Sequence, residues 1–136
     1  MPVALDRKYE KFLGGPTQPT QERVYISINR DSRFVFNHNL YCLLGKPPAV
    51  YLHFSRSDDM IAVEPVHSHR MPSAFPVKQL TGGKSWLIQA APFCKHFGIR
   101  IDTTERFISP EIRDGALHLK LAETVTVRQH RRKKRN

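Results

Sequence analysis

Residues 32–46 read Ser-Arg-Phe-Val-Phe-Asn-His-Asn-Leu-Tyr-Cys-Leu-Leu-Gly-Lys and decide the fold, because they predict a strand that turns directly into a short helix. Phe34 and Phe36 stand two residues apart, which is the period of a strand with one buried face. Asn37 and Asn39 are candidate N-caps, because an Asx side chain accepts the free backbone N–H groups of a first helical turn. The apolar residues at helical spacing and the natural C-cap after them are Leu40, Leu43, Leu44 and Gly45.

A second stretch, residues 85–99, repeats this design without a gap as Ser-Trp-Leu-Ile-Gln-Ala-Ala-Pro-Phe-Cys-Lys-His-Phe-Gly-Ile. The aligned positions are Ser32 with Ser85, Phe34 with Leu87, Val35 with Ile88, Leu40 with Phe93, Leu44 with Phe97 and Gly45 with Gly98. Two β-rich stretches around a charged turn follow each copy, at 50–54 and 60–63 and again at 106–109 and 116–121. The pattern predicts an internal duplication, and the alternative is a chance match between common strand–helix–strand segments.

The length of 136 residues accommodates one compact domain or two very small ones. Copies this short bury little surface each, so we expect them to pack on each other or on another chain. The sequence predicts a mainly β fold with short helices, of the α+β class. Its expected parts are an N-terminal arm and linker (1–20), a first repeat (21–66), a connector (67–73), a second repeat (74–122) and a basic, disordered tail (123–136).

The net charge of +10 is unevenly distributed along the chain. Six of the 22 basic residues lie within 128–136 without an acid, which leaves 16 basic against 12 acidic residues elsewhere. Nucleic acid is the commonest partner of such a tail, because each cation near a phosphate releases a condensed counterion. A solubility tail, a nuclear-import signal and an anionic membrane surface are the alternatives.

The two cysteines, Cys42 and Cys94, both fall on predicted helices and are expected to be reduced thiols. The His67-Ser68-His69 stretch, joined by Cys94 or His96, would supply too few ligands at regular spacing for a metal site. We therefore expect no metal and no cofactor.

No catalytic constellation emerges from the sequence, and we expect the protein not to be an enzyme. Asp58-Asp59 lies in a predicted hairpin turn, and Cys94 and His96 stand two apart on a helix, where they do not face each other. Residues 82–85, Gly-Gly-Lys-Ser, lack the earlier glycine and the following helix of a phosphate loop.

The first copy resembles the core of AbrB/MazE/SpoVT-like DNA-binding domains, in which a glycine and an arginine precede alternating apolar residues, a proline, a short helix and Leu-Gly. Residues 32–36, Leu40 and Leu44-Gly45 match this pattern in register. The departures are Ser32 for glycine, Asn37 for proline and Tyr41 for arginine, and in the second copy Trp86 for arginine and Ala90 for proline. The tandem arrangement resembles MraZ-type proteins and spans most of residues 24–121.

This resemblance implies an interlocked swapped-hairpin-like β barrel, formed between two chains or between the two copies of one chain. It further implies a DNA-binding protein, either a transcriptional regulator or an antitoxin, that acts as a homo-oligomer or an intramolecular pseudo-dimer. Arg33 alone stands at the position of the family arginine. With no apolar run of membrane-spanning length and no signal peptide, we expect a cytoplasmic, nucleoid-associated protein.

The expected partner is duplex DNA, read by basic residues of the first strand and the turns beside it. The candidate nucleic-acid-binding residues are Arg30, Arg33, Lys46, Lys84, Arg128, Arg131, Arg132, Lys133, Lys134 and Arg135. Two alternatives stay open: a protein-interaction module such as an antitoxin or assembly factor, and an RNA-binding protein. In the second, exposed rings of Phe34, Tyr41 or Trp86 would stack on bases, although their alternation favours a core role.

Overall fold

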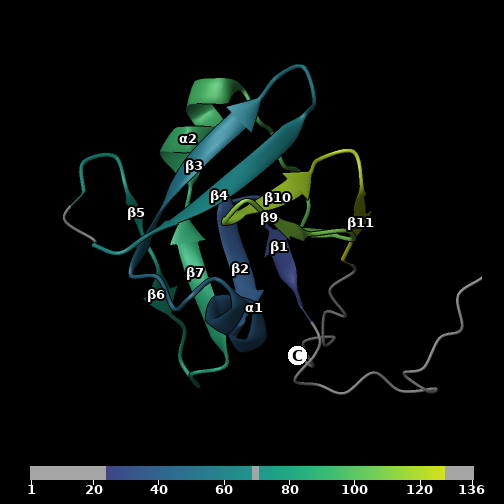
Figure 1. Ribbon diagram of the computed structural model, residues 1–136. Helices are drawn as coiled ribbons and strands as arrows, with labels where there is room; N and C mark the ends of the chain where they lie inside the picture. Colours follow the sequence, from purple (N-terminus) through teal and green to yellow (C-terminus); the bar gives the residue numbers. More distant parts are fainter. Residues whose placement is uncertain (1–23, 69–70, 128–136) are drawn as a thin grey trace, which may run out of the picture.

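The computed structural model describes residues 24–68 and 71–127 (Figure 1). Its elements in chain order are β1 (Ile26–Ile28), β2 (Arg33–Asn37), α1 (His38–Leu43), β3 (Ala49–Ser55), β4 (Met60–Val66), β5 (Phe75–Pro76), β6 (Lys78–Gln79), β7 (Ser85–Gln89), α2 (Ala91–Phe97), β8 (Glu105–Phe107), β9 (Glu111–Arg113), β10 (Ala116–Lys120) and β11 (Thr124–Thr126). The predicted mainly β class with short helices is confirmed.

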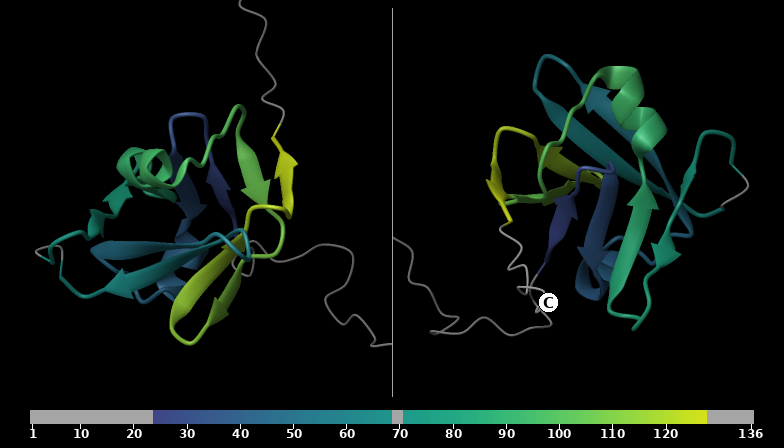
Figure 2. Two further views of the ribbon diagram at one scale, coloured as in Figure 1. Left: turned by 90° about the horizontal axis from the view of Figure 1, so that it is seen from above. Right: turned by 180° about the vertical axis from the view of Figure 1, so that it is seen from behind.

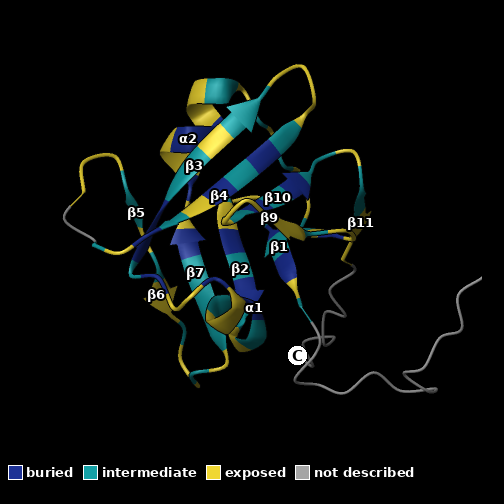
Figure 3. Ribbon diagram, viewed as in Figure 1, coloured by how far each residue is buried: buried dark blue, intermediate teal, exposed yellow. Residues whose placement is uncertain are grey.

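The strands form two antiparallel sheets that lie one above the other (Figure 2). Sheet A has the order β11-β8-β1-β2-β7-β6, and sheet B has the order β5-β3-β4-β10-β9. Side chains from both sheets meet in one core, in which Phe34 and Ile88 of sheet A and Ile61 and Leu119 of sheet B are all fully buried. Figure 3 shows that the buried residues follow the strands, whereas the connecting turns are exposed.

The expected barrel is wrong for the described residues, because neither sheet closes. Sheet A ends at β11 and β6, and sheet B ends at β5 and β9. These outer strands are two or three residues long. Closure needs a continuous ladder with a consistent stagger, and such short edges cannot supply one. The result is a pair of packed open sheets.

Each sheet joins the two halves of the chain by pairing a strand of the first half with a strand of the second half. In sheet A, β2 pairs with β7 over five residue pairs, from Arg33 opposite Gln89 to Asn37 opposite Ser85. In sheet B, β4 pairs with β10. In the four-strand segments β1-β2-β7-β6 and β3-β4-β10-β9, two strands of the first half stand next to two strands of the second half. The second-half strands follow in the reverse order, so each segment has an approximate two-fold arrangement. Both halves therefore depend on each other for their core.

The gapless alignment of residues 32–46 with 85–99 is wrong within the strand. It places Phe34, which is fully buried, on Leu87, which points away from the core beside buried Ile88. Strands β2 and β7 instead correspond from first to last residue, so Phe34 matches Trp86. The extra residue is Ala90, which lies between β7 and α2, whereas α1 follows β2 directly. A one-residue shift in a strand exchanges its two faces, which is why the sequence match misassigns them.

Three further boundaries differ from expectation. The stretch 106–109 does not form a hairpin with β10, because β8 pairs with β1 in sheet A and β9 takes that place. The stretch 123–136 is not all tail, since Thr124–Thr126 forms β11 against β8. Its β-branched residues favour a strand. Finally, residues 74–78, whose composition predicts one strand at the start of the second half, contribute to two, because the chain leaves β5 in sheet B and enters β6 in sheet A.

The helices begin and end largely as expected. The side chain of Asn37 caps α1 by accepting a hydrogen bond from the backbone N–H of Leu40 at 3.3 Å. Pro92 lies in the first turn of α2, whose N-cap residue Ala90 makes no side-chain cap. Gly98 ends α2 with a φ of 68°, in the left-handed region that glycine adopts without strain.

Candidate nucleic-acid interface

The outer face of sheet A, meaning the strand side chains that point away from the core, is a surface six strands wide. Phe34 and Ile88 point into the core, so their neighbours Val35 and Leu87 point outward. One row of outward residues crosses all six strands, as Lys78, Leu87, Val35, Ser27, Arg106 and Val125. Tyr25 lies on the same side, where the guanidinium carbon of Arg106 is 5.5 Å from its ring centroid.

Among the residues that the structure describes, cations from three strands lie on this outer face, and no strand places an acidic side chain there. Arg33 of β2, Lys78 of β6 and Arg106 of β8 are all exposed. Glu105 of β8 lies opposite buried Ile28, so it points toward the opposite side of the sheet. Within residues 24–68 and 71–127, no ion pair involves any of the three cations. The outer face of sheet A therefore carries uncompensated positive charge, which attracts polyanions.

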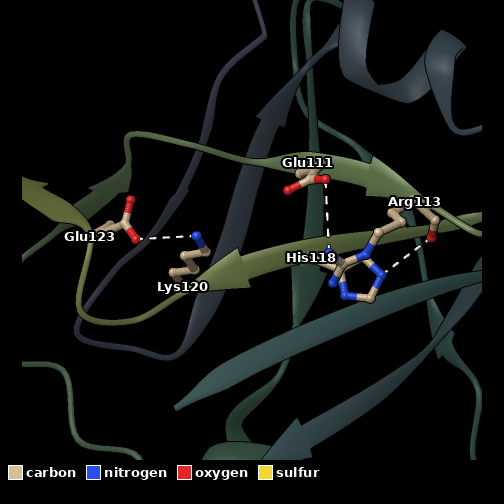
Figure 4. Close-up of polar contacts among 5 residues, drawn as sticks. All are labelled: Glu111, Arg113, His118, Lys120 and Glu123. Atoms are coloured by element: carbon tan, nitrogen blue, oxygen red, sulfur yellow. Dashed lines mark hydrogen bonds and ion pairs between the residues drawn. The ribbon is translucent and has the colours of Figure 1, made fainter. Parts of the chain in front are cut away.

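Sheet B shows the opposite arrangement, because its cations have acidic neighbours (Figure 4). Arg113 Nη1 lies 3.9 Å from Glu111 Oε1, and Lys120 Nζ lies 3.4 Å from Glu123 Oε2. Hydrogen bonds, first from the Ser109 hydroxyl and then from Lys120, lower the pKa of the Glu123 carboxyl. Among the described residues, the strand cations of sheet B thus have acidic partners, whereas those of sheet A do not.

The β1–β2 turn holds two of the predicted contact residues, Arg30 and Arg33, in a defined position. The side-chain oxygen of Asn29 accepts hydrogen bonds from the backbone N–H groups of Asp31 and Arg33, both at 3.0 Å. Ser32 has a φ of 60°, in the left-handed region where glycine costs least. The glycine that the resemblance implies at this position would therefore fit the observed backbone.

The two other predicted contacts, Lys84 and Lys46, lie at the opposite end of the β2–β7 ladder. The backbone N–H of His38, the first residue of α1, donates to the carbonyl of Lys84 at 3.1 Å. The N–H of Lys46 donates to the carbonyl of Tyr41 in the same helix at 3.0 Å. The structure therefore brings Arg30 and Arg33 together, and it places Lys84 and Lys46 beside α1. The predicted contacts Arg128, Arg131, Arg132, Lys133, Lys134 and Arg135 lie outside the described residues.

The aromatic residues considered for base stacking pack within the protein. Phe34 is fully buried. The rings of Tyr41 and Trp86 stack on each other with centroids 3.6 Å apart. The Trp86 indole N–H donates to Nδ1 of His38 at 3.3 Å, and Nε2 of His38 lies 3.3 Å from the sulfur of Cys42. One face of each ring is thus already covered.

The two cysteines are not paired with each other; Cys42 is exposed and Cys94 is buried. Burial raises the pKa of the Cys94 thiol, and a hydrogen bond with Ser32 opposes the rise. Of the considered metal ligands, His69 lies outside the described residues. In the part of the chain that the structure describes, no three His, Cys, Asp or Glu side chains are grouped as a metal site would require.

Sequence reasoning missed Lys78 and Arg106 on the outer face, and Lys95 and Arg100 near the β1–β2 turn. Arg106 precedes buried Phe107, so its outward direction could be read from alternation. Its place on sheet A could not, because that depends on the distant pairing of β8 with β1.

Among the described residues, no helix is both long and apolar enough to cross a membrane. Comparison with known proteins gives no match to a family model, a curated protein or a solved structure.

Proposed function

We propose that this protein is a transcription regulator of the AbrB-like kind, which binds duplex DNA through the outer face of sheet A and the turns at its two ends. The observation that carries the proposal is the segregation of charge. Arg33, Lys78 and Arg106 share a face without acids, whereas Arg113 and Lys120 on sheet B lie beside carboxylates. DNA-binding surfaces need such uncompensated cations, because phosphate contacts supply most of the affinity.

The length of the β2–β7 ladder suits a DNA groove. Four residue steps separate the pair Arg33–Gln89 from the pair Asn37–Ser85, which is about 14 Å at ~3.4 Å per residue. The major groove of B-DNA is about 12 Å wide. Cations at the two ends of the ladder can therefore contact phosphates on opposite sides of one groove.

The two halves of one chain would supply the pseudo-dimer that the resemblance implies, since β2–β7 and β4–β10 already join them. The basic residues 128–136 would add attraction that does not depend on sequence. Together these features support a DNA-bound, nucleoid-associated protein.

The test is a salt titration of binding to a fluorescent 20-base-pair duplex of mixed sequence, followed by anisotropy. Arg33→Gln/Arg106→Gln is compared with Arg113→Gln/Lys120→Gln, which removes the same charge from sheet B. We expect the slope of log K against log salt to fall by about 1.8 for the first pair, since each phosphate contact contributes about 0.9. The second pair should leave the slope nearly unchanged. Equal effects of the two pairs would refute the assignment of the interface to sheet A.

The tail is tested separately in the full-length chain. Glutamine replaces all six of its cations, namely Arg128, Arg131, Arg132, Lys133, Lys134 and Arg135. We expect weaker binding that still responds to Arg33→Gln/Arg106→Gln. Complete loss of binding would show that the folded part does not read DNA.

A protein-interaction module is the second candidate, and exposed apolar residues favour it. Ile108 is 55% exposed and Ile112 is 43% exposed, on neighbouring segments around β9. Val125 of β11 is 42% exposed. A protein that fails the duplex titration and instead elutes with a partner in size-exclusion chromatography would support this candidate.

A further inference from the structure

A hollow of about 500 Å³ opens between the β1–β2 turn, helix α2 and the stretch that follows α2. Figure 2 shows these segments beside one another at one end of the molecule. The hollow is lined by three cations from three segments: Arg30 from the turn, Lys95 from α2 and Arg100 from the following stretch. Among the described residues, Asp102 is the one acid in its lining. It lies 3.4 Å from Arg100, so Arg30 and Lys95 keep their charge uncompensated.

From this arrangement we infer that the hollow binds a phosphate group, donated by the backbone of the DNA that lies on sheet A. The inference rests on the proposed function for the source of the phosphate, and on the cation set for its chemistry. Arg33, on the outer face, starts β2 immediately after the turn that carries Arg30. A DNA strand leaving that face would therefore pass the hollow.

The scaffold around the hollow is held in place before any ligand binds. The backbone N–H of Ala90 donates to the carbonyl of Ser32 at 2.9 Å, and the Ser32 side chain hydrogen bonds with Cys94. The turn is therefore tied to the start of α2 and to its buried side. A turn whose backbone is already fixed loses little backbone freedom when a ligand binds, which lowers the entropic cost of binding.

The C-terminal end of α2, which repels anions, is shielded from the hollow by its own caps. The carbonyl of Cys94 accepts the N–H of Ile99 at 2.9 Å, and the carbonyl of Lys95 accepts the N–H of Gly98 at 3.4 Å. The negative helix end is therefore partly compensated, and Lys95 at this end adds further positive charge.

The lining contains cations of two kinds that suit a phosphate. The planar guanidinium groups of Arg30 and Arg100 can each offer two parallel N–H groups, and Lys95 offers a point charge. Asp102 competes for Arg100 in the free protein. Its removal should therefore strengthen phosphate binding, which gives a test by gain as well as by loss.

The experiment follows backbone amide shifts of the ¹⁵N-labelled full chain during two titrations, one with inorganic phosphate and one with the 20-base-pair duplex. Chloride at matched ionic strength is the reference. We expect shifts at Ser32, Gly98 and Arg100 in both titrations, and their loss in Arg30→Gln/Lys95→Gln. That variant should also reduce the salt slope of duplex binding by about 1.8.

Asp102→Asn is the variant that should gain affinity for phosphate. Asp114→Asn in the β9–β10 turn is its control, because it removes the same charge at a distant position. We expect a several-fold lower dissociation constant for inorganic phosphate in Asp102→Asn alone. Asp102→Asn therefore tests the phosphate site even if Arg30→Gln/Lys95→Gln perturbs the turn.

The outcomes separate the inference from the proposed function. Duplex binding without shifts in the hollow would overturn the inference and leave DNA binding on sheet A intact. Phosphate shifts in a chain that does not bind the duplex would overturn DNA as the source and assign the hollow to a free phosphorylated compound. No shift with either probe, or equal effects of Asp102→Asn and Asp114→Asn, would overturn the phosphate site itself.

Discussion

Phe34 is the residue whose truncation most directly tests how the two halves are joined. It is fully buried on β2, lies opposite Ile88 of β7, and its ring centroid is 6.4 Å from that of Phe107 on β8. Truncation of a buried phenylalanine to alanine costs about 3–5 kcal/mol, because apolar contacts are lost and a cavity remains. For a domain with a total stability of about 5–15 kcal/mol, Phe34→Ala should remove a large share.

The assay is equilibrium unfolding in urea, followed by the fluorescence of Trp86, the single tryptophan, which stacks on Tyr41 beside the ladder. At an m-value of about 1–3 kcal/mol/M, Phe34→Ala should lower the midpoint by more than about 1 M. Val35→Ala is the control on the same strand, and its outward side chain should cost about 1 kcal/mol or less. Similar losses in Phe34→Ala and Val35→Ala would refute the assignment of the two faces.

Three further predictions concern the helices and the buried thiol. Asn37→Ala should cost about 1 kcal/mol in urea unfolding, because Leu40 loses its cap, and no loss would show that the cap is dispensable. Gly98→Ala should cost a similar amount, about 1–2 kcal/mol, through backbone strain alone, since its φ is +68° and nothing lies within 4 Å of an added Cβ. Calorimetry measures this loss of stability, with Ala91→Gly as a control within the helix. Because burial raises the pKa of Cys94, its contribution to stability is complete below the ordinary value of 9.0 and is lost as pH rises through the folded-state pKa. Between pH 8 and pH 10, the free energy of unfolding should therefore fall more for the native chain than for Cys94→Ala. An equal fall in both proteins would contradict the burial of the thiol.

Local structure could be predicted from the sequence, and long-range pairing could not. The alternation of Phe34 and Phe36 and the cap at Asn37 are encoded within a few residues, and the structure has β2 and α1 there. The pairing of β8 with β1 brings Arg106 opposite Ser27, across most of the chain. Nothing near Arg106 in the sequence specifies that neighbour, because it depends on the packing of the whole core.

The candidate site likewise has a part that local sequence predicts and a part that depends on long-range contacts. Arg30 and Arg33 could be selected as exposed residues of a turn, because a turn is a local feature. The hollow beside them also needs Lys95 and Arg100, which come from the other half of the chain. Its formation depends on the hydrogen bond from Ala90 to Ser32, a contact between the halves.

The two ends of the β2–β7 ladder are alike in backbone and unlike in side chains, and this difference bears on how DNA would be held. In the corrected alignment, outward Arg33 of β2 corresponds to Ser85 of β7, so the second half lacks a cation at that position. Buried Phe34 corresponds to Trp86, which is engaged with Tyr41 of α1. The α1 end thus packs Trp86 against Tyr41 and offers the exposed Lys46 and Lys84, whereas the α2 end offers the larger set of cations, Arg30, Arg33, Lys95 and Arg100. A chain with this division would place its stronger phosphate contacts on one side of the groove, even though its strands are arranged in two similar halves.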